Sequence, residues 1–311
     1  MAIQPSDYNN IRDKIVNVMG TGADGYGQAL VSVTATSANV ISATLWNGLR
    51  TDMLKARQHQ TGVDESANLP ILTRTTTITT AIRDTFNAYA DVIVANKRVC
   101  ADNQGTVENI ITTTAYTSPW NTVLYHRITV TFTSANQAKY FFNAGGQIRL
   151  RASRTGVAAN SKDTEWTNIL GDVADGGSNK GMGTIYMNWT QTDTVTDTAG
   201  VGRAGAGTGI GFYDLLTSNP GQQLYIVTSD PSTGYGVNDY NISARIDAAP
   251  GSTGRILTFV VQFRDDIGGG VDESVTGSLK SFAQVFRPSG SNVSVTGPTG
   301  SQEGPGLTVL T

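Results

Sequence analysis

The spacing of apolar residues changes once along the chain, and this change is the feature that most constrains the fold. Up to about residue 100 the apolar residues recur at intervals of three and four. From Tyr116 onward they alternate with polar residues, between clusters of Gly, Pro, Asn and Ser. The first pattern is typical of amphipathic helices and the second of half-buried antiparallel strands. The sequence therefore predicts an α+β protein, with a helical N-terminal module followed by an antiparallel β-sandwich domain that is jelly-roll-like.

The segment from Cys100 to Gly105 is the best candidate for a domain boundary. We expect a helical module at residues 1–104, an antiparallel β-sandwich at 105–287 and an extended arm at 288–311. The last segment is rich in Ser, Gly, Thr and Pro but lacks the three-residue glycine period of collagen. If it is ordered, we expect this arm to lie across a neighbouring subunit.

Three helices are predicted in the first module. Ser6 is expected to cap a helix that Gly20 ends, Ser42 to start a helix that ends before Gly62, and the third helix to span about 77–96. Trp46 should be a packing anchor. The apolar stripes of the first two helices contain the residues that we expect to serve in assembly or docking: Tyr8, Ile11, Trp46 and Leu49.

The stretch from Tyr140 to Arg154 combines aromatic residues and a Gly-Gly turn with an alternating strand. Ile148 and Leu150 fall on one face of that strand, and polar residues fall on the other. A strand over 256–263 is apolar on both faces, which favours a central position in a sheet. Other strands are predicted at 124–132, where His126 shares the apolar face, and at 184–189, 224–228 and 240–246.

Two Gly-rich polar segments, 172–183 and 193–211, are interpreted as long loops at the rims of the sheets. Tyr186 and Trp189 lie close to them and are the candidates for glycan contact. Other tyrosines near predicted loops could also bind sugars, although core packing is the commoner fate of such residues. They are Tyr213, Tyr225, Tyr235 and Tyr240.

Composition argues against several classes of function. The 311 residues have a formal net charge of -3 and only 15% charged residues, without the clusters of Lys and Arg that binding to nucleic acid usually needs. No run of about 18 apolar residues occurs, so neither membrane insertion nor export is predicted. Because Cys100 is the only cysteine, the fold has no internal disulfide. We expect synthesis in a cytoplasm.

Three patterns could indicate chemistry. The run from Gly20 to Gly27 matches the spacing of a dinucleotide-binding loop, but a helix precedes it, which favours a helix-terminating loop. His59, His126 and Cys100 are too few for a dedicated metal site with the usual spacings. A cluster of carboxylates fits a solvated hairpin tip better than a cation site, since its spacing differs from that of an EF-hand. Its members are Asp265, Asp266, Asp272 and Glu273.

A hydrolase would need a nucleophile with its base, or a pair of carboxylates in a cleft. The chain has no G-x-S-x-G motif, and its supply of acid, base and metal-binding groups is thin. Carboxylate pairs of the glycosidase type leave no reliable spacing in a sequence. The sequence therefore predicts a protein that is not an enzyme, with no catalytic residues, cofactor or metal.

Four short blocks, together with the stretch from Tyr140 to Arg154, point to a family. The blocks are Ser6-Asp-Tyr-Asn-Asn-Ile-Arg-Asp-Lys-Ile, Gly25-Tyr-Gly-Gln, Leu45-Trp-Asn-Gly-Leu-Arg-Thr-Asp and His59-Gln-Thr-Gly. In these segments, which cover about half of the chain in scattered pieces, the sequence resembles virion structural proteins of contractile-tailed cyanobacterial phages. Members of this group are described as structural, fibre or neck proteins.

The resemblance implies a virion component of the neck or tail, resembling a whisker or fibre. Residues 1–104 would then be a virion-docking module. Because virions repeat each part symmetrically, we expect a homo-oligomer, such as a trimer or hexamer, whose partners are copies of itself and other virion proteins. A carbohydrate-binding adhesin of the tail that recognises a host surface glycan is the alternative. A virion-associated glycan hydrolase is a third hypothesis.

Overall fold

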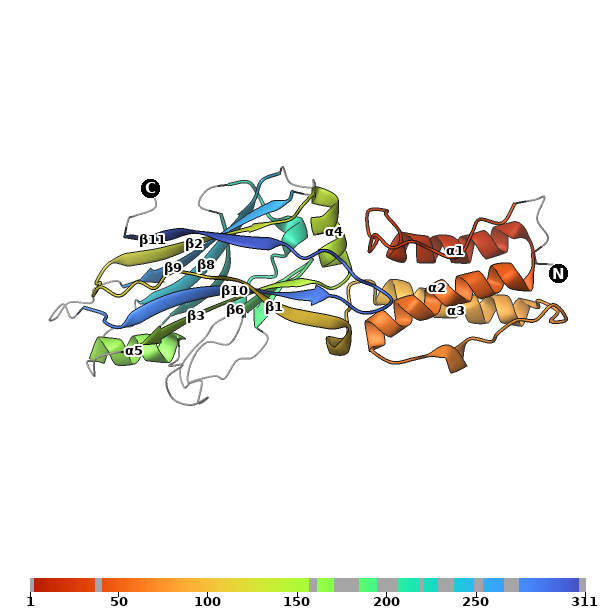
Figure 1. Cartoon of the computed structure of the whole chain (residues 1–311), viewed down its shortest axis with the longest axis horizontal. Coiled ribbons are helices and arrows are strands. Elements are labelled where there is room, and N and C mark those ends of the chain that lie inside the picture. Colours follow the sequence, from red (N-terminus) through yellow and green to blue (C-terminus); the bar gives the residue numbers. More distant parts are fainter. Residues whose placement is uncertain are drawn as a thin grey trace. The chain divides into compact units, whose positions relative to one another are not determined.

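The computed structural model describes residues 3–36, 41–156, 161–170, 185–194, 206–218, 221–228, 238–248, 254–265 and 274–307. Three N-terminal helices precede two antiparallel sheets, so the expected α+β class with a β-sandwich is confirmed (Figure 1). The chain divides into two compact units. The helical unit comprises Met1–Thr106, Lys139–Gly146 and Arg287–Gly297, and the β unit comprises Val107–Ala138, Gln147–Phe286 and Pro298–Thr311. Both units are therefore built from segments that are far apart in the sequence.

The helices of the first unit begin and end at local sequence features. They are α1 (Pro5–Met19), α2 (Ala43–Thr61) and α3 (Thr80–Ala95). The Ser42 hydroxyl accepts a hydrogen bond from the Leu45 amide, as expected of an N-cap, and Gly62 ends α2 in the left-handed conformation. The cap of α1 is Gln4 rather than the predicted Ser6. Ser6 lies inside the first turn because Pro5 takes the first helical position, which suits its fixed φ.

All three helices run in the same direction. Near their beginnings the Trp46 ring packs edge-on against Tyr8, with centroids 5.5 Å apart, and against Phe86, at 4.8 Å. Near their ends the Gln60 side chain of α2 donates to the Ile93 carbonyl of α3 at 2.9 Å. Figure 1 shows the three helices side by side. Since short turns give antiparallel neighbours, a parallel bundle needs long segments that return the chain to its starting end.

The first return segment, which connects α1 to α2, is attached to α1 by side chains. The Asn9 amide accepts from the Ala35 N–H at 2.9 Å and donates to the Ala35 carbonyl at 2.8 Å. Arg12 donates to the carbonyl of Ser32, three residues earlier in the segment. On α2 the Asp52 carboxylate accepts from the backbone N–H of Ser32 at 2.8 Å. These bonds satisfy backbone groups of an extended segment, a task that a sheet would otherwise perform.

The second return segment, which connects α2 to α3, is attached to α2 in the same way. The Asn47 amide accepts from the Leu72 N–H at 3.0 Å and donates to the Leu72 carbonyl at 2.8 Å. Arg50 donates to the carbonyl of Leu69, again three residues earlier, at 2.9 Å. The residues responsible share one pattern, an aromatic residue followed by Asn, any residue, an aliphatic residue and Arg, in Tyr8–Arg12 and Trp46–Arg50. This internal repeat was not recognised from the sequence.

The third helix keeps only half of the pattern. Phe86 and Asn87 match its first two positions, but Ala90 replaces the arginine. The Asn87 amide accepts from Lys14 on α1 at 2.9 Å and donates to Asp91 at 3.3 Å. A polar link between side chains thus closes the side of the bundle between α3 and α1.

The C-terminal ends of the helices are covered by the two later segments of the helical unit. The His59 ring bonds the Ala144 carbonyl, with 2.8 Å between Nε2 and O, and the Asn143 amide donates to the Gly25 carbonyl at 3.0 Å. Asn143 ends helix α4 (Ala135–Asn143), which the sequence did not predict. Gly145 then adopts φ +87, which favours glycine, and the chain continues into β3. The expected Gly-Gly turn therefore connects a helix to a strand.

The strands of the β unit form two antiparallel sheets. The first has the order β1-β10-β3-β4-β5 and the second β11-β2-β9-β8-β7-β6. A short helix, α5 (Ser161–Leu170), packs beside β3 (Figure 1). The strand bounds are β1 Gly105–Thr112, β2 Val123–Thr131, β3 Gln147–Thr155, β4 Ile185–Met187, β5 Thr192–Thr194, β6 Ala206–Gly207, β7 Gln222–Thr228, β8 Asp239–Ile246, β9 Ile256–Arg264, β10 Ser278–Pro288 and β11 Thr299–Leu307.

The predicted alternation is present where the two sheets meet. Leu124, His126, Ile128 and Val130 on β2 are fully buried, and the residues between them are half-buried. The strand predicted at 256–263 is β9, which lies between β2 and β8, so its central position is confirmed. One face of β2 therefore packs into the sandwich core, as alternation requires.

The C-terminal segment differs from the expected arm. Thr299–Leu307 is the edge strand β11 of the chain's own second sheet, where Thr299 pairs with Thr131 and Glu303 with Arg127. A Cβ at Gly300 would lie 2.7 Å from the Ile110 carbonyl, so glycine allows a close approach to β1. Because this segment of Gly, Ser and Thr lacks apolar alternation, its sequence suggested an extended arm and not a strand. Its pairing depends on backbone hydrogen bonds instead.

Candidate functional site

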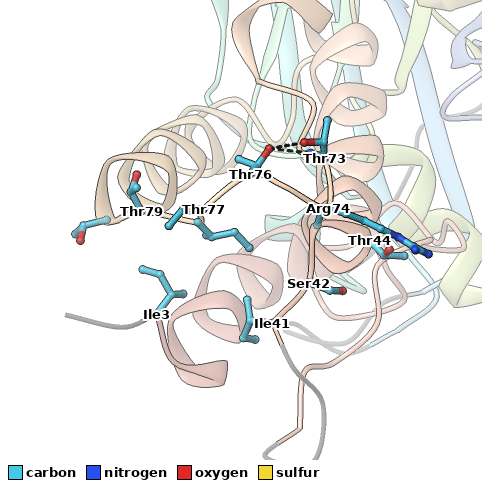
Figure 2. Close-up of a pocket in the computed structure, with 12 residues that line it drawn as sticks. Ile3, Ile41, Ser42, Thr44, Thr73, Arg74, Thr76, Thr77 and Thr79 are labelled. Atoms are coloured by element: carbon cyan, nitrogen blue, oxygen red, sulfur yellow. Dashed lines mark hydrogen bonds between the residues drawn. The ribbon is translucent and has the colours of Figure 1, made fainter.

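A large pocket opens at the end of the helical unit where the helices begin. Its volume is about 990 Å³, at the upper end of the range that ligand pockets show. Figure 2 shows Ile3 and Ile41 near one another, with Thr77 and Thr79 across from them. The pocket is lined by residues that precede or start the helices: Ile3, Ile41, Ser42, Ala43, Thr44, Thr73, Arg74, Thr76, Thr77, Ile78, Thr79 and Thr80.

The lining combines hydroxyl groups with a few isoleucines. Thr79 caps α3 by accepting from the Ile82 amide, and Thr73 and Thr76 bond each other through their hydroxyls at 2.9 Å (Figure 2). These bonds hold the segment that leads into α3. Among the described residues that line the pocket, Arg74 is the only charged one.

The parallel arrangement gives this end of the bundle a positive electrostatic potential. Each helix N-terminus has about half a positive charge, and here three of them begin at one end. The Asp7 carboxylate offsets part of this potential, because it accepts from the Gln4 amide at 2.8 Å and lies 3.8 Å from Arg83. With Arg74 added, the pocket suits polar or acidic groups better than basic ones.

The predicted docking residues lie in the core just behind this pocket. Tyr8, Trp46 and Leu49 are 0% exposed and Ile11 is 2% exposed. They position the helices and do not reach solvent, and Trp46 is the packing anchor that was expected. The surface residues at this end were missed because they lie outside the helical stripes. Isoleucines immediately before the helix starts, Ile3 and Ile41, were the available signal.

The predicted glycan contacts have different exposures. Trp189 is only 6% exposed and packs between Phe212 and Tyr213, with ring centroids at 5.6 Å and 5.5 Å. Tyr213 is 56% exposed, whereas Tyr186 on β4 is half-buried. An aromatic cluster is therefore present at this place, and Tyr213 is its exposed member.

Two of the other tyrosines near predicted loops lie in the core. Tyr225 and Tyr240 are 2% and 0% exposed, so core packing is confirmed for both. Tyr235, the whole of 172–183 and most of 193–211 lie outside the described residues.

Both histidines are buried away from any surface chemistry. Burial lowers the pKa of His59 to about 4, and the bond with the Ala144 carbonyl opposes this only in part. Burial likewise lowers the pKa of His126 to about 4. The His126 ring bonds the Ser281 hydroxyl, with 2.7 Å between Nδ1 and Oγ. A serine beside a histidine resembles a nucleophile with its base. Both side chains are 0% exposed, however, and the bond joins β2 of one sheet to β10 of the other.

The other residues considered for chemistry have structural roles. Burial, and then the Asp102 charge, raise the pKa of Cys100 to about 12, so its thiol stays protonated and unreactive. The run from Gly20 to Gly27 is a helix-terminating loop, in which the Gly27 N–H donates to the Gly20 carbonyl at 2.8 Å.

Asp265 faces Lys162, and the other members of the carboxylate cluster, Asp266, Asp272 and Glu273, lie outside the described residues. Within the described ranges, no group of three or more His, Cys, Asp or Glu residues could hold a metal ion.

Comparison with known proteins identified no relative of this chain. No family model, curated protein or solved structure matches the chain. In the part of the chain that the structure describes, no helix is both long enough and apolar enough to span a membrane.

Proposed function

We propose that this chain is a structural component of a tailed-phage virion, assembled as a homo-oligomer at the neck or tail. The helical unit docks to the particle, and the β unit projects outward or packs against symmetry mates. The observation that favours this role is the open end of the parallel helices, where a pocket of about 990 Å³ is lined by hydroxyls, isoleucines and one arginine. Such a surface suits a protein segment as its partner.

The segments that resemble phage virion proteins support the proposal by their position. Ser6–Ile15 contains Asn9 and Arg12, which bind the first return segment. Leu45–Asp52 contains Asn47 and Arg50, which bind the second. The resemblance therefore concerns the residues that make the helices parallel and so create the open end.

Two measurements test the assembly. Light scattering coupled to size-exclusion chromatography should give a mass of two or more whole chains, and antibodies against the chain should label purified tailed particles at the neck or tail. A strict monomer at every concentration, together with unlabelled particles, would contradict the proposal.

A charge reversal tests the docking surface. Arg74→Glu places a negative charge at the pocket and should reduce incorporation into particles while leaving the helical content unchanged. Lys55→Glu, on the side of α2 and outside the pocket lining, is the matched control and should incorporate normally. Equal incorporation of both variants would exclude this end of the bundle as the docking surface.

The exposed ring of Tyr213 favours a second candidate function, a tail adhesin that binds a host surface glycan. Aromatic rings stack on sugar faces, and Tyr213 is supported from behind by Trp189. Binding on a glycan array should then be lost in Tyr213→Ala and weakened in Tyr186→Ala, but kept in Tyr125→Ala on the second sheet. Absence of binding by the unmodified protein to every glycan would dismiss this candidate.

A further inference from the structure

Lys162 and Asp265 form a buried pair in the β unit. The ammonium nitrogen Nζ lies 2.8 Å from the carboxylate oxygen Oδ2, and the two side chains are 3% and 0% exposed. Lys162 is in α5 and Asp265 directly follows β9, so the pair joins residues 103 positions apart in the sequence. The sequence did not single out Lys162, and Asp265 was considered there only as a member of the carboxylate cluster.

Aromatic side chains pack together on the same two elements that hold this pair. Trp166, one turn further along α5, packs edge-on against Trp120 with centroids 4.9 Å apart and lies 6.3 Å from the ring of Phe263. Phe263 precedes Asp265 by two residues in the same strand segment. In a medium of low dielectric, separated charges are costly, and a buried acid and base can both become neutral by transferring a proton. Such a transfer turns the lysine into a nucleophilic amine beside a protonated carboxyl group.

We propose that Lys162 and Asp265 condense to an intramolecular isopeptide bond. The neutral amine attacks Cγ of the protonated carboxyl group with its lone pair, and a C–N bond forms. The C–O bond to the carboxyl hydroxyl then breaks, and this hydroxyl leaves with one amine proton as a molecule of water. No electrons are exchanged and no co-reactant is needed. The fold supplies the proximity that makes such a step effectively unimolecular.

Glu165 is assigned as the group that moves the proton. It lies three positions after Lys162 in α5, so both side chains emerge from the same face of the helix, and it is 7% exposed. A buried carboxyl group can accept the proton that the attacking nitrogen loses and deliver it to the departing oxygen.

A second buried ion pair, made by the next residue of α5, shows what the proposed reaction requires. Arg154 pairs with Asp163, and both side chains are 1% exposed. The Asp163 carboxylate also accepts from the Thr276 amide at 2.9 Å and from the Thr276 hydroxyl at 2.7 Å. A guanidinium stays protonated and delocalised in proteins, so it offers no lone pair for attack. The Arg154 pair therefore remains ionic, and the structure contains its own unreactive counterpart.

The test is the intact mass of the purified full-length protein. The expected mass is lower than the sequence mass by one water molecule, and proteolysis should release a branched peptide that joins the segment around Lys162 to the segment around Asp265. A mass equal to that of the sequence, both in fresh protein and after long incubation, would overturn the proposal. So would a loss of water that maps to other residues.

Two variants test separately the residue that attacks and the residue that moves the proton. Lys162→Arg keeps the ion pair but should restore the full sequence mass and lower the thermal midpoint. Continued loss of water in this variant would refute the assignment of the nucleophile. Glu165→Gln should slow formation about a hundredfold, within the usual range for acid–base groups. Formation at the unmodified rate would remove Glu165 from the reaction.

Asp265→Asn should reach the same final mass as the cross-linked protein, because an amide loses ammonia where the acid loses water. Retention of the full variant mass would contradict attack at this carbon. If any variant fails to fold, the branched peptide from the unmodified protein still decides the question.

Discussion

The two units of the molecule use their buried and half-buried polar side chains in different ways. In the helical unit these side chains bind the backbone: Asn9 and Asn47 each hold both backbone groups of one residue, and Asp52 accepts from the amide of Ser32. In the β unit the buried charged side chains form ion pairs, Arg154–Asp163 and Lys162–Asp265, and the first of these pairs also bonds the backbone of Thr276.

The difference follows from what the backbone needs in each unit. Strands satisfy their own N–H and C=O groups through the ladder, so a polar side chain in the sandwich has few backbone partners left. The extended return segments of the helical unit have no strand beside them, and side chains must take that place. One unit therefore uses polar residues to position its backbone, and the other uses them to attach α5 to the sheets.

Breaking the Arg154–Asp163 pair should give one of the two largest effects. Asp163→Ala leaves a buried guanidinium without its carboxylate and should lower the free energy of unfolding by about 3 to 5 kcal/mol in denaturant titrations. The apolar double variant Arg154→Met with Asp163→Leu should recover most of this loss. Glu303→Ala at the exposed Arg127 pair is the control and should cost less than about 1 kcal/mol. If Asp163→Ala alone lowers the free energy of unfolding by less than about 1 kcal/mol, the β unit does not depend on its buried charges.

Removing the packing anchor of the helical unit should have an effect of the same size. Trp46→Ala deletes a fully buried ring that contacts both Tyr8 and Phe86, and it should lower the free energy of unfolding by about 3 to 5 kcal/mol. Val33→Ala, at a side chain that is 57% exposed, should change it by less than about 0.5 kcal/mol. Circular dichroism during denaturation provides the measurement, and an equally small effect at Trp46 would refute the packing role.

Acid should weaken both units over the same pH range, although their histidines have different partners. The folded-state pKa of each is about 4, below the ordinary value of 6.5, so the unfolded chain binds the proton first. The stabilisation is complete above pH 6.5 and is lost as the pH falls toward 4. The loss amounts to about 3 kcal/mol for each histidine, from 1.36 kcal/mol per pKa unit. Urea titrations across this range that show constant stability would contradict the burial of both rings.

The smallest effects should distinguish the asparagines that follow an aromatic residue in the three helices, Asn9, Asn47 and Asn87. Asn9→Ala or Asn47→Ala leaves a backbone N–H and C=O without their partner and should cost about 1 to 3 kcal/mol. Asn87→Ala removes only the link with Lys14 and Asp91 and should cost less than about 0.5 kcal/mol. Equal losses at all three positions in thermal denaturation would show that the return segments do not depend on these side chains.

Local features of the sequence were sufficient to predict several elements. Ser42 and Gly62 bound α2 as caps do, and the alternation over 124–132 identified both the strand β2 and its buried face. The prediction failed where a residue's environment comes from distant segments. β11 has no apolar alternation because its pairing is made by the backbone, and α4 was missed between two strands.

The candidate site was predictable only in part, for the same reason. Helical stripes indicate which side chains face inward, and the residues expected in docking, Tyr8, Ile11, Trp46 and Leu49, are core residues for that reason. They do not indicate which end of a bundle stays open. The pocket exists because two return segments carry the chain back to the same end, and the aromatic–Asn pattern that attaches them acquires its meaning only with Ala35 and Leu72 in place.

The sequence by itself determined the fold class, the ends of α2 and the buried face of β2, because caps and periodicity act within a few residues. Only the tertiary structure decided that the helices are parallel, that residues 139–146 and 287–297 belong to the helical unit, and that Lys162 meets Asp265. These features depend on contacts between segments that are far apart in the chain. Hydrogen bonds and buried charges of this kind leave no local pattern, since each partner alone resembles an ordinary polar residue.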